Sequence, residues 1–154
     1  MRTRQSGFTV VELLVAVAIS GVIASLMGTA IYQFFTVTGR GSDEMTAVHN
    51  IQNAAHWFSI DGQQARPLPA PIADSASLTL TMPDDSTIIY AIPPGTTNLI
   101  RTAGASELTV ARNITDIVFS DDGRVVTMDI TSAPGGGWGV SEQKIYTVYR
   151  RPTV

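Results

Sequence analysis

Few residues of this 154-residue chain have the type and spacing that metal chemistry requires. His49 and His56 are separated by seven positions in a helical pattern, so both imidazoles face the same side and could share a metal ion. Protein zinc sites take three or four such ligands, and the sequence has only these two histidines and no cysteine. We therefore interpret the pair as part of a polar helix surface and predict no metal site.

Two aspartate pairs are the candidates for calcium. Asp84-Asp85 and Asp121-Asp122 could supply carboxylate oxygens, but calcium takes six to eight oxygen ligands. Each pair also lies in a turn signal, "PDD" and "DDG", where aspartate is favoured for backbone reasons. We interpret both pairs as turn residues.

The other candidate motifs are weaker. The loop "GGGWG" at 135–139 lacks the lysine and hydroxyl residue of a phosphate-binding loop, so Trp138 either covers the core or offers a contact at a loop tip. No residue stands in a recognisable nucleophile motif, and we predict neither a cofactor nor enzymatic activity. The formal net charge is −3, and only Arg150 and Arg151 are adjacent basic residues, so we predict no direct nucleic-acid binding.

Glu12 is a lone carboxylate at the start of a long apolar run. No Asp, Glu, Lys or Arg occurs from Leu13 to Gly39, and roughly 20 apolar residues are enough to span a bilayer as a helix. A carboxylate in such a helix costs about 2–3 kcal/mol at full depth and less near the interface. Glu12 therefore lies in the headgroup region or pairs with a cation from another chain.

The charges that flank the apolar run predict its orientation. Arg2 and Arg4 precede it, and basic residues next to a membrane helix are usually retained in the cytoplasm. We expect a single pass through the cytoplasmic membrane, in contact with its lipid, with the N-terminus in the cytoplasm and everything after the run outside.

The residues around Glu12 form a specific pattern. The basic leader "MRTRQS" is followed by Gly7 and Phe8 in the order Gly-Phe-Thr-x-x-Glu, which closely resembles the processing site of type IV prepilins and type II secretion pseudopilins. The resemblance implies that a prepilin peptidase removes residues 1–7 and methylates the amine of Phe8. It also implies that Glu12 pairs with the Phe8 amine of a neighbouring subunit in an extracytoplasmic filament.

The same resemblance implies a set of partners. They are other pilin or pseudopilin subunits, an assembly platform in the membrane, and an ATPase that acts indirectly through that platform. The role implied for the chain is mechanical: it is a structural subunit of a pilus-like filament or a secretion pseudopilus.

An ordinary secretory signal peptide is the alternative. A basic start and an apolar core describe such peptides too, and Gly28 and Ala30 offer small residues for a cut. The rest would then be a secreted or membrane-tethered binding module that uses Trp138, Tyr146 and Tyr149. Against this, the apolar run continues past Ala30 into "IYQFF".

The resemblance to prepilins also implies one long N-terminal helix over residues 8–66. Its membrane part covers about 8–36, and its amphipathic part, about 43–65, is separated from it by "GRGSDEMT", a hinge or a soft spot. The apolar residues of the amphipathic part recur at helical spacing on one face. They are Val48, Ile51, Ala54, Ala55 and Phe58.

Residues 67–154 predict β structure. Alternating or β-branched runs predict strands, and Asp122-Gly123 suits a hairpin turn. The expected strands are residues 77–82, 86–92, 98–102, 108–120, 124–131 and 144–151. The fold class is therefore α+β, with a long N-terminal helix packed against a small antiparallel β-sheet domain.

A weaker resemblance concerns the type of subunit. Asp61 and Ala65 near the helix end, with Leu99 and Arg101 in a later strand, loosely match the layout of J-type minor pseudopilins and related minor pilins. This resemblance implies a minor subunit.

Overall fold

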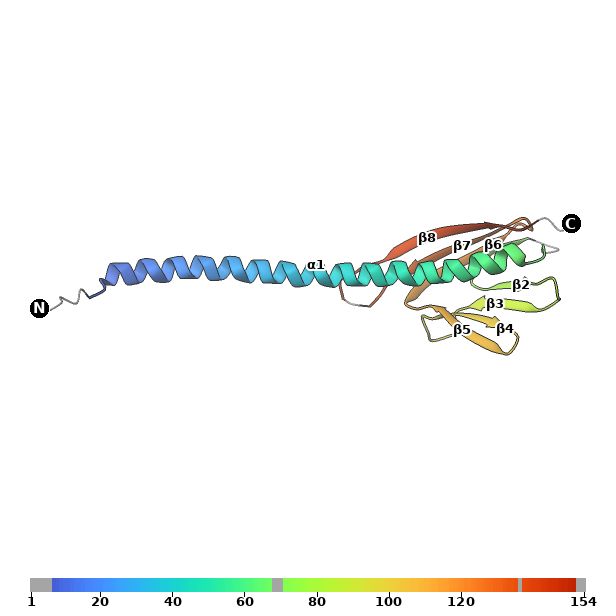
Figure 1. Cartoon of the computed structure of the whole chain (residues 1–154), viewed down its shortest axis with the longest axis horizontal. Coiled ribbons are helices and arrows are strands. Elements are labelled where there is room, and N and C mark those ends of the chain that lie inside the picture. Colours follow the sequence, from blue (N-terminus) through green and yellow to red (C-terminus); the bar gives the residue numbers. More distant parts are fainter. Residues whose placement is uncertain (1–6, 68–70, 136, 152–154) are drawn as a thin grey trace, which may run out of the picture. The chain divides into compact units, whose positions relative to one another are not determined.

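The computed structural model describes residues 7–67, 71–135 and 137–151. The expected leader lies outside these residues except for Gly7. The elements of the described chain, in order, are α1 (Val10–Gln64), β1 (Ile72–Ser75), β2 (Leu78–Thr81), β3 (Thr87–Ala91), β4 (Leu99–Ala103), β5 (Ser106–Ala111), β6 (Ile114–Asp121), β7 (Val125–Ser132) and β8 (Glu142–Tyr149). The fold class expected from the sequence, a long helix packed against antiparallel strands, is confirmed (Figure 1).

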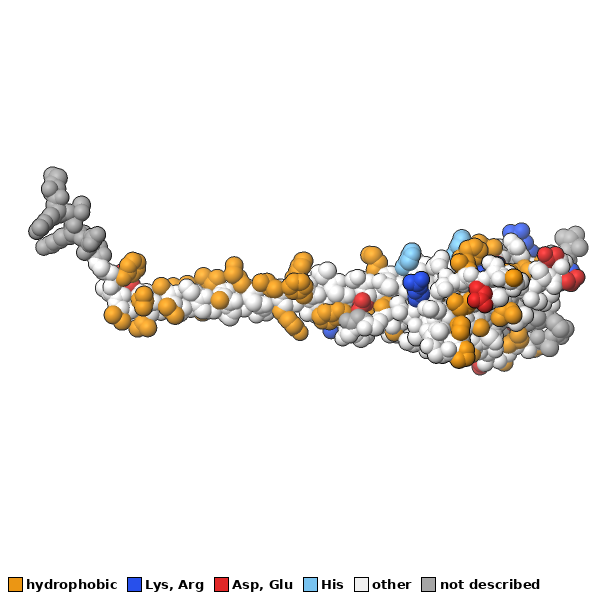
Figure 2. Space-filling model, turned by 90° about the horizontal axis from the view of Figure 1, so that it is seen from below, with side chains coloured by type: hydrophobic (Ala, Val, Ile, Leu, Met, Phe, Trp, Pro, Cys, Tyr) orange, Lys and Arg blue, Asp and Glu red, His pale blue; other side chains and the backbone are white. Residues whose placement is uncertain are grey.

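The chain divides into two compact units, residues 1–39 and residues 40–154. In the first unit every described residue from Gly7 to Phe35 is exposed, although most are apolar. Among the described residues, α1 is the helix long and apolar enough to cross a membrane, by length and composition. Figure 2 shows hydrophobic side chains along the surface of this part of α1.

The part of α1 in the second unit buries the face that the periodicity predicted. Ile51, Ala54 and Phe58 are at most 1% exposed, and Ala55 is buried as well. The expected hinge or soft spot at residues 39–46 is helical throughout. The helix ends at Gln64, shortly before Pro67, because a proline nitrogen has no hydrogen to continue the ladder.

The strands form two four-stranded antiparallel sheets rather than the one sheet expected. Their orders are β1-β6-β7-β8 and β2-β3-β4-β5. Both sheets contribute to one core with α1: the ring of Phe58 lies 6.4 Å from that of Tyr90 in β3 and 6.2 Å from that of Phe119 in β6, between centroids. The helix therefore joins the two sheets into one hydrophobic cluster.

The division into two sheets occurs inside a run that the sequence predicted as one strand, residues 108–120. Arg112 and Asn113 interrupt it, and Asn113 has φ 57°, a left-handed conformation that asparagine tolerates better than most residues. The chain then leaves β5 and starts β6 in the other sheet. The short strand β1, which pairs with β6 through an irregular register, was not expected either.

The hairpin between β6 and β7 agrees with its sequence signal. Asp121 pairs with Val126, the backbone nitrogen of Asp122 donates to the carbonyl of Val125 at 3.1 Å, and Gly123 has φ 90°. A positive φ at the first central residue of a two-residue loop is what a type II′ turn requires. The glycine of the Asp-Gly pair is thus explained by the backbone conformation of the turn.

Close packing at the end of α1 depends on Gly62. A Cβ atom built there would lie 3.1 Å from a methyl group of Val148 in β8. This space is tighter than ordinary van der Waals contact, so glycine allows the helix backbone to approach β8 closely. The backbone nitrogen of Arg151 also donates to the carbonyl of Gln63 at 3.3 Å.

Candidate functional site

Gly7, Phe8 and Glu12 lie around the start of α1. Gly7, Phe8 and Thr9 have no regular structure, and α1 begins at Val10. The carbonyl of Thr9 accepts the first bond of the helix, from the backbone nitrogen of Leu13 at 3.2 Å. The Gly7–Phe8 peptide bond therefore precedes the helix and is accessible, with Phe8 88% exposed.

Glu12 and Thr9 cap this helix start reciprocally. The Oε2 atom of Glu12 accepts hydrogen bonds from the backbone nitrogen and the hydroxyl of Thr9, both at 2.9 Å. In return, the backbone nitrogen of Glu12 donates to the Thr9 hydroxyl oxygen at 3.3 Å. This is a capping box, which satisfies backbone donors that the first turn of a helix leaves free.

The capping box is a feature that our interpretation of the sequence missed. Thr9-x-x-Glu12 has the Ser/Thr-x-x-Glu spacing of the motif, directly before an apolar run. Glu12 had been interpreted through its charge alone. The structure adds that its carboxylate already has a partner in its own chain and that Gly7, Phe8, Thr9 and Glu12 line a surface hollow.

The three aromatic residues of the alternative binding surface are not gathered in one place. Trp138, 36% exposed, precedes β8, whereas Tyr149, 72% exposed, is its last residue, and a strand of this length extends roughly 25 Å. Tyr146 packs against the core on the other face of the strand. The structure therefore shows no single aromatic patch made of these residues.

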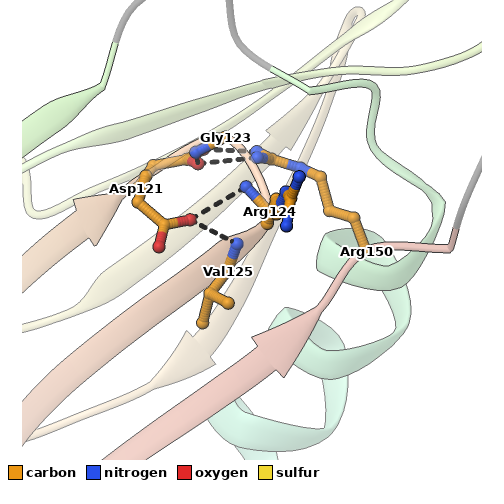
Figure 3. Close-up of polar contacts among 6 residues, drawn as sticks. Asp121, Gly123, Arg124, Val125 and Arg150 are labelled. Atoms are coloured by element: carbon orange, nitrogen blue, oxygen red, sulfur yellow. Dashed lines mark hydrogen bonds and ion pairs between the residues drawn. The ribbon is translucent and has the colours of Figure 1, made fainter.

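The two residues of one aspartate pair have separate tasks. Asp121, 1% exposed, forms a buried ion pair with Arg150, whose Nη1 lies 2.6 Å from Oδ1 (Figure 3). Asp122 accepts from the backbone nitrogens of Arg124 at 2.8 Å and Val125 at 2.7 Å. The hydrogen bonds from Val125 and Arg124 lower the pKa of Asp122 below its usual value.

The other aspartate pair is engaged as well. Asp84 accepts from the hydroxyl of Ser86 at 2.6 Å, and this bond lowers the pKa of the aspartate. Asp85 forms an exposed ion pair with Arg66. Within the described parts of the chain, no group of three or more His, Cys, Asp or Glu side chains could hold a metal ion.

A polar network that was not expected ties α1 to the second sheet. Asp61 is 4% exposed and lies in the last turn of the helix, where the negative end of the helix dipole disfavours a carboxylate. Arg101 of β4 compensates it, donating to both oxygens at 2.6 and 3.0 Å, and Tyr90 donates at 2.5 Å. The guanidinium carbon of Arg101 also lies 5.0 Å from the ring centre of Trp57.

The pKa shifts in this network follow from its hydrogen bonds. The bond to Asp61 raises the pKa of Arg101, and burial followed by the same carboxylate raises the pKa of Tyr90. Both shifts favour the protonated forms, which are the forms that donate hydrogen bonds to Asp61. Asp61 and Arg101, which the sequence offered only as a loose likeness to minor subunits, are brought together as a contact between helix and sheet.

A second unexpected contact involves the polar face of α1. Asn53 lies between the two histidines along the helix, and its side-chain nitrogen donates to the carbonyl of Val110 in β5 at 2.7 Å. β5 is one of the two edge strands of its sheet. A side chain bonded to an edge carbonyl blocks that position to strands of other chains.

Comparison with known proteins concerns the N-terminus. A family model described as "Prokaryotic N-terminal methylation motif" matches residues 2–28, which include the capped helix start and the first part of the apolar segment. No solved structure matches the chain. The chain thus carries the N-terminal methylation motif of type IV prepilins and pseudopilins, which implies processing by a prepilin peptidase.

Proposed function

We propose that the chain is a structural subunit of a type IV pilus-like filament or a type II secretion pseudopilus. The observation that carries the proposal is the matched motif at residues 2–28 joined to an apolar helix segment that is exposed along its length. An isolated protein in water would not keep so many large apolar side chains exposed. Lipid covers them before assembly, and neighbouring subunits cover them afterwards.

In this proposal the peptidase cuts between Gly7 and Phe8. The position of the bond supports this site, because it lies outside the helix and ahead of the helix cap, where an active site could enclose it. The segment is held with its N-terminus in the cytoplasm and the β domain outside. The platform and the other subunits then receive the processed chain through its helix.

Glu12 has the role of docking group. Cleavage creates a positive amine on Phe8, and a carboxylate near hydrocarbon is stabilised strongly by such a cation. Each subunit contributes one Glu12 and one Phe8 amine, so only an assembled filament pairs both groups along its length. We assign the chain to the minor subunits because Asp61, Ala65, Leu99 and Arg101 loosely resemble the layout of those subunits.

The first experiment is the mass and N-terminal sequence of the full chain purified from its native membrane fraction. A chain that starts at Phe8 and carries one added methyl group is the expected result. A chain that starts near Ile31 would instead show ordinary secretion and overturn the proposal. Gly7→Val should retain the leader, visible as a larger species on a gel.

Two substitutions of Glu12 test the docking role separately from processing. Glu12→Val should permit cleavage but reduce incorporation into sheared filaments, because both the charge and the cap are lost. Glu12→Gln keeps a carbonyl oxygen for the cap and loses only the charge. Normal incorporation of both variants would contradict the docking role, while a defect in both would assign it to the charge.

A further inference from the structure

The two oxygens of the Glu12 carboxylate are not equivalent. Oε2 accepts both hydrogen bonds from Thr9, whereas Oε1 takes part in no hydrogen bond among the residues that the structure describes. Residues 1–6 lie outside that set, but the proposed processing removes them. The two hydrogen bonds of the cap join Thr9 and Glu12, which both remain in the processed chain.

A held carboxylate differs physically from a free one. Two hydrogen bonds from Thr9 offset part of the cost of keeping a negative charge near hydrocarbon. They also restrict the side chain before any partner arrives, so less conformational entropy is lost on docking. Phe8, Thr9 and Glu12 line a surface hollow, so a small group can approach there; Gly7, which also lines it, is removed by the proposed processing.

We propose that Thr9 is a positioning residue for assembly, holding Glu12 through Oε2 so that Oε1 receives the N-terminal ammonium group of a second subunit. The inference rests on the proposed function and adds to it the residue that orients the docking group. It also explains why the site fits an ammonium group. A guanidinium group binds carboxylates best through two parallel bonds, and here Thr9 already uses one of the two oxygens.

The experiment uses the full chain in its native host, expressed beside the wild-type chain so that low incorporation remains measurable. Thr9→Val keeps the shape of the side chain but removes the hydroxyl, and Thr9→Ser is the matched control that keeps it. The readout is the amount of variant in sheared filaments relative to the membrane pool. We expect about a tenfold loss for Thr9→Val, the size of one lost hydrogen bond to a charged group, and rescue by Thr9→Ser.

Coupling to Glu12 separates positioning from a purely structural role. If Thr9 acts through the carboxylate, Thr9→Val should cause no further loss in a Glu12→Ala background. A further loss there, or normal incorporation of Thr9→Val alone, would overturn the inference. A leader retained in Thr9→Val would overturn it too, because Thr9 would then act at cleavage.

These variants also separate the positioning role of Thr9 from the docking role of Glu12 on which it rests. If Glu12→Ala lowers incorporation and Thr9→Val does not, only the positioning role of Thr9 is excluded. Normal incorporation of Glu12→Ala removes the docking role of Glu12 and the inference together.

Discussion

The two units of the chain treat the same kinds of side chain in opposite ways. Phe34 and Leu26 of the first unit are 67% and 66% exposed, whereas Phe58 and Leu78 of the second are fully buried. Phe34 and Phe58 belong to one helix, α1, so intrinsic helix propensity does not explain the difference. The second unit has strands to cover its apolar face, and the described part of the first has no such cover in its own chain.

This contrast shows that burial in one chain and burial in the functional state are different properties. Apolar surface left exposed on this scale marks a contact with lipid or with other protein. The periodicity differs accordingly: residues 10–37 are apolar around most of the helix, while residues 47–62 are buried on one face only. A helix that is apolar on all sides is typical of a membrane span or an assembly core.

The largest expected effect compares one residue type in the two units. Phe58→Ala should lower the free energy of unfolding of the β domain by about 3–5 kcal/mol, because it leaves a cavity between both sheets. Phe34→Ala should change it by no more than about 0.5 kcal/mol, as for an exposed site. Urea unfolding of the full chain in detergent, followed by tryptophan fluorescence, measures both. Equal losses of unfolding free energy in the two variants would contradict the difference in burial between the two units.

One arginine introduced into each unit tests whether lipid covers the apolar helix segment of the first unit. Leu26→Arg should make membrane insertion less favourable by about 2.5–3.5 kcal/mol, because arginine near the middle of a span is costly. Met45→Arg, at a site 75% exposed on the same helix, should stay in the membrane as the wild-type chain does. The fraction that resists carbonate extraction reports the difference. Equal retention of both variants would argue against lipid around Leu26.

The smallest effect concerns an exposed group that does have partners in its own chain. Hydrogen bonds from Val125 and Arg124 lower the pKa of Asp122 in the folded state. The contribution of Asp122 to the free energy of unfolding is therefore fully present above the unfolded pKa of about 3.9. That contribution is lost as the pH falls through the lower folded value.

Asp122→Asn keeps the acceptor oxygen and removes the titration. The stability difference between wild type and variant should therefore shrink as the pH falls below about 4. Urea midpoints of the two chains between pH 2 and 6 measure it. A difference that grows on acidification would contradict the assigned hydrogen bonds.

Local patterns in the sequence predicted the elements but not how they meet. Helical spacing identified the buried face at Ile51 and Phe58, and alternation identified the strands that contain Leu80 and Tyr90. The break at Asn113 was missed because its apolar neighbours continue on both sides and the left-handed conformation leaves no periodic signal.

Contacts between distant residues were out of reach of such patterns. Asp61 and Arg101 are 40 positions apart, and Asp121 and Arg150 are 29 apart, so spacing gives no sign that they pair. The Thr9–Glu12 cap differs, because its partners are three positions apart and its motif was readable. Of the candidate site, the sequence thus supplied the residues and the structure supplied the hydrogen bonds between them.

The contact between the helix end and β8 has a consequence for the order of synthesis. Gly62 and Gln63 meet Val148 and Arg151, and the buried cation of Arg150 is the partner of Asp121. The helix is made long before these partners, so its end stays uncovered until β8 follows. Until Arg150 is made, burial of Asp121 would leave a carboxylate without its cation, which is strongly unfavourable.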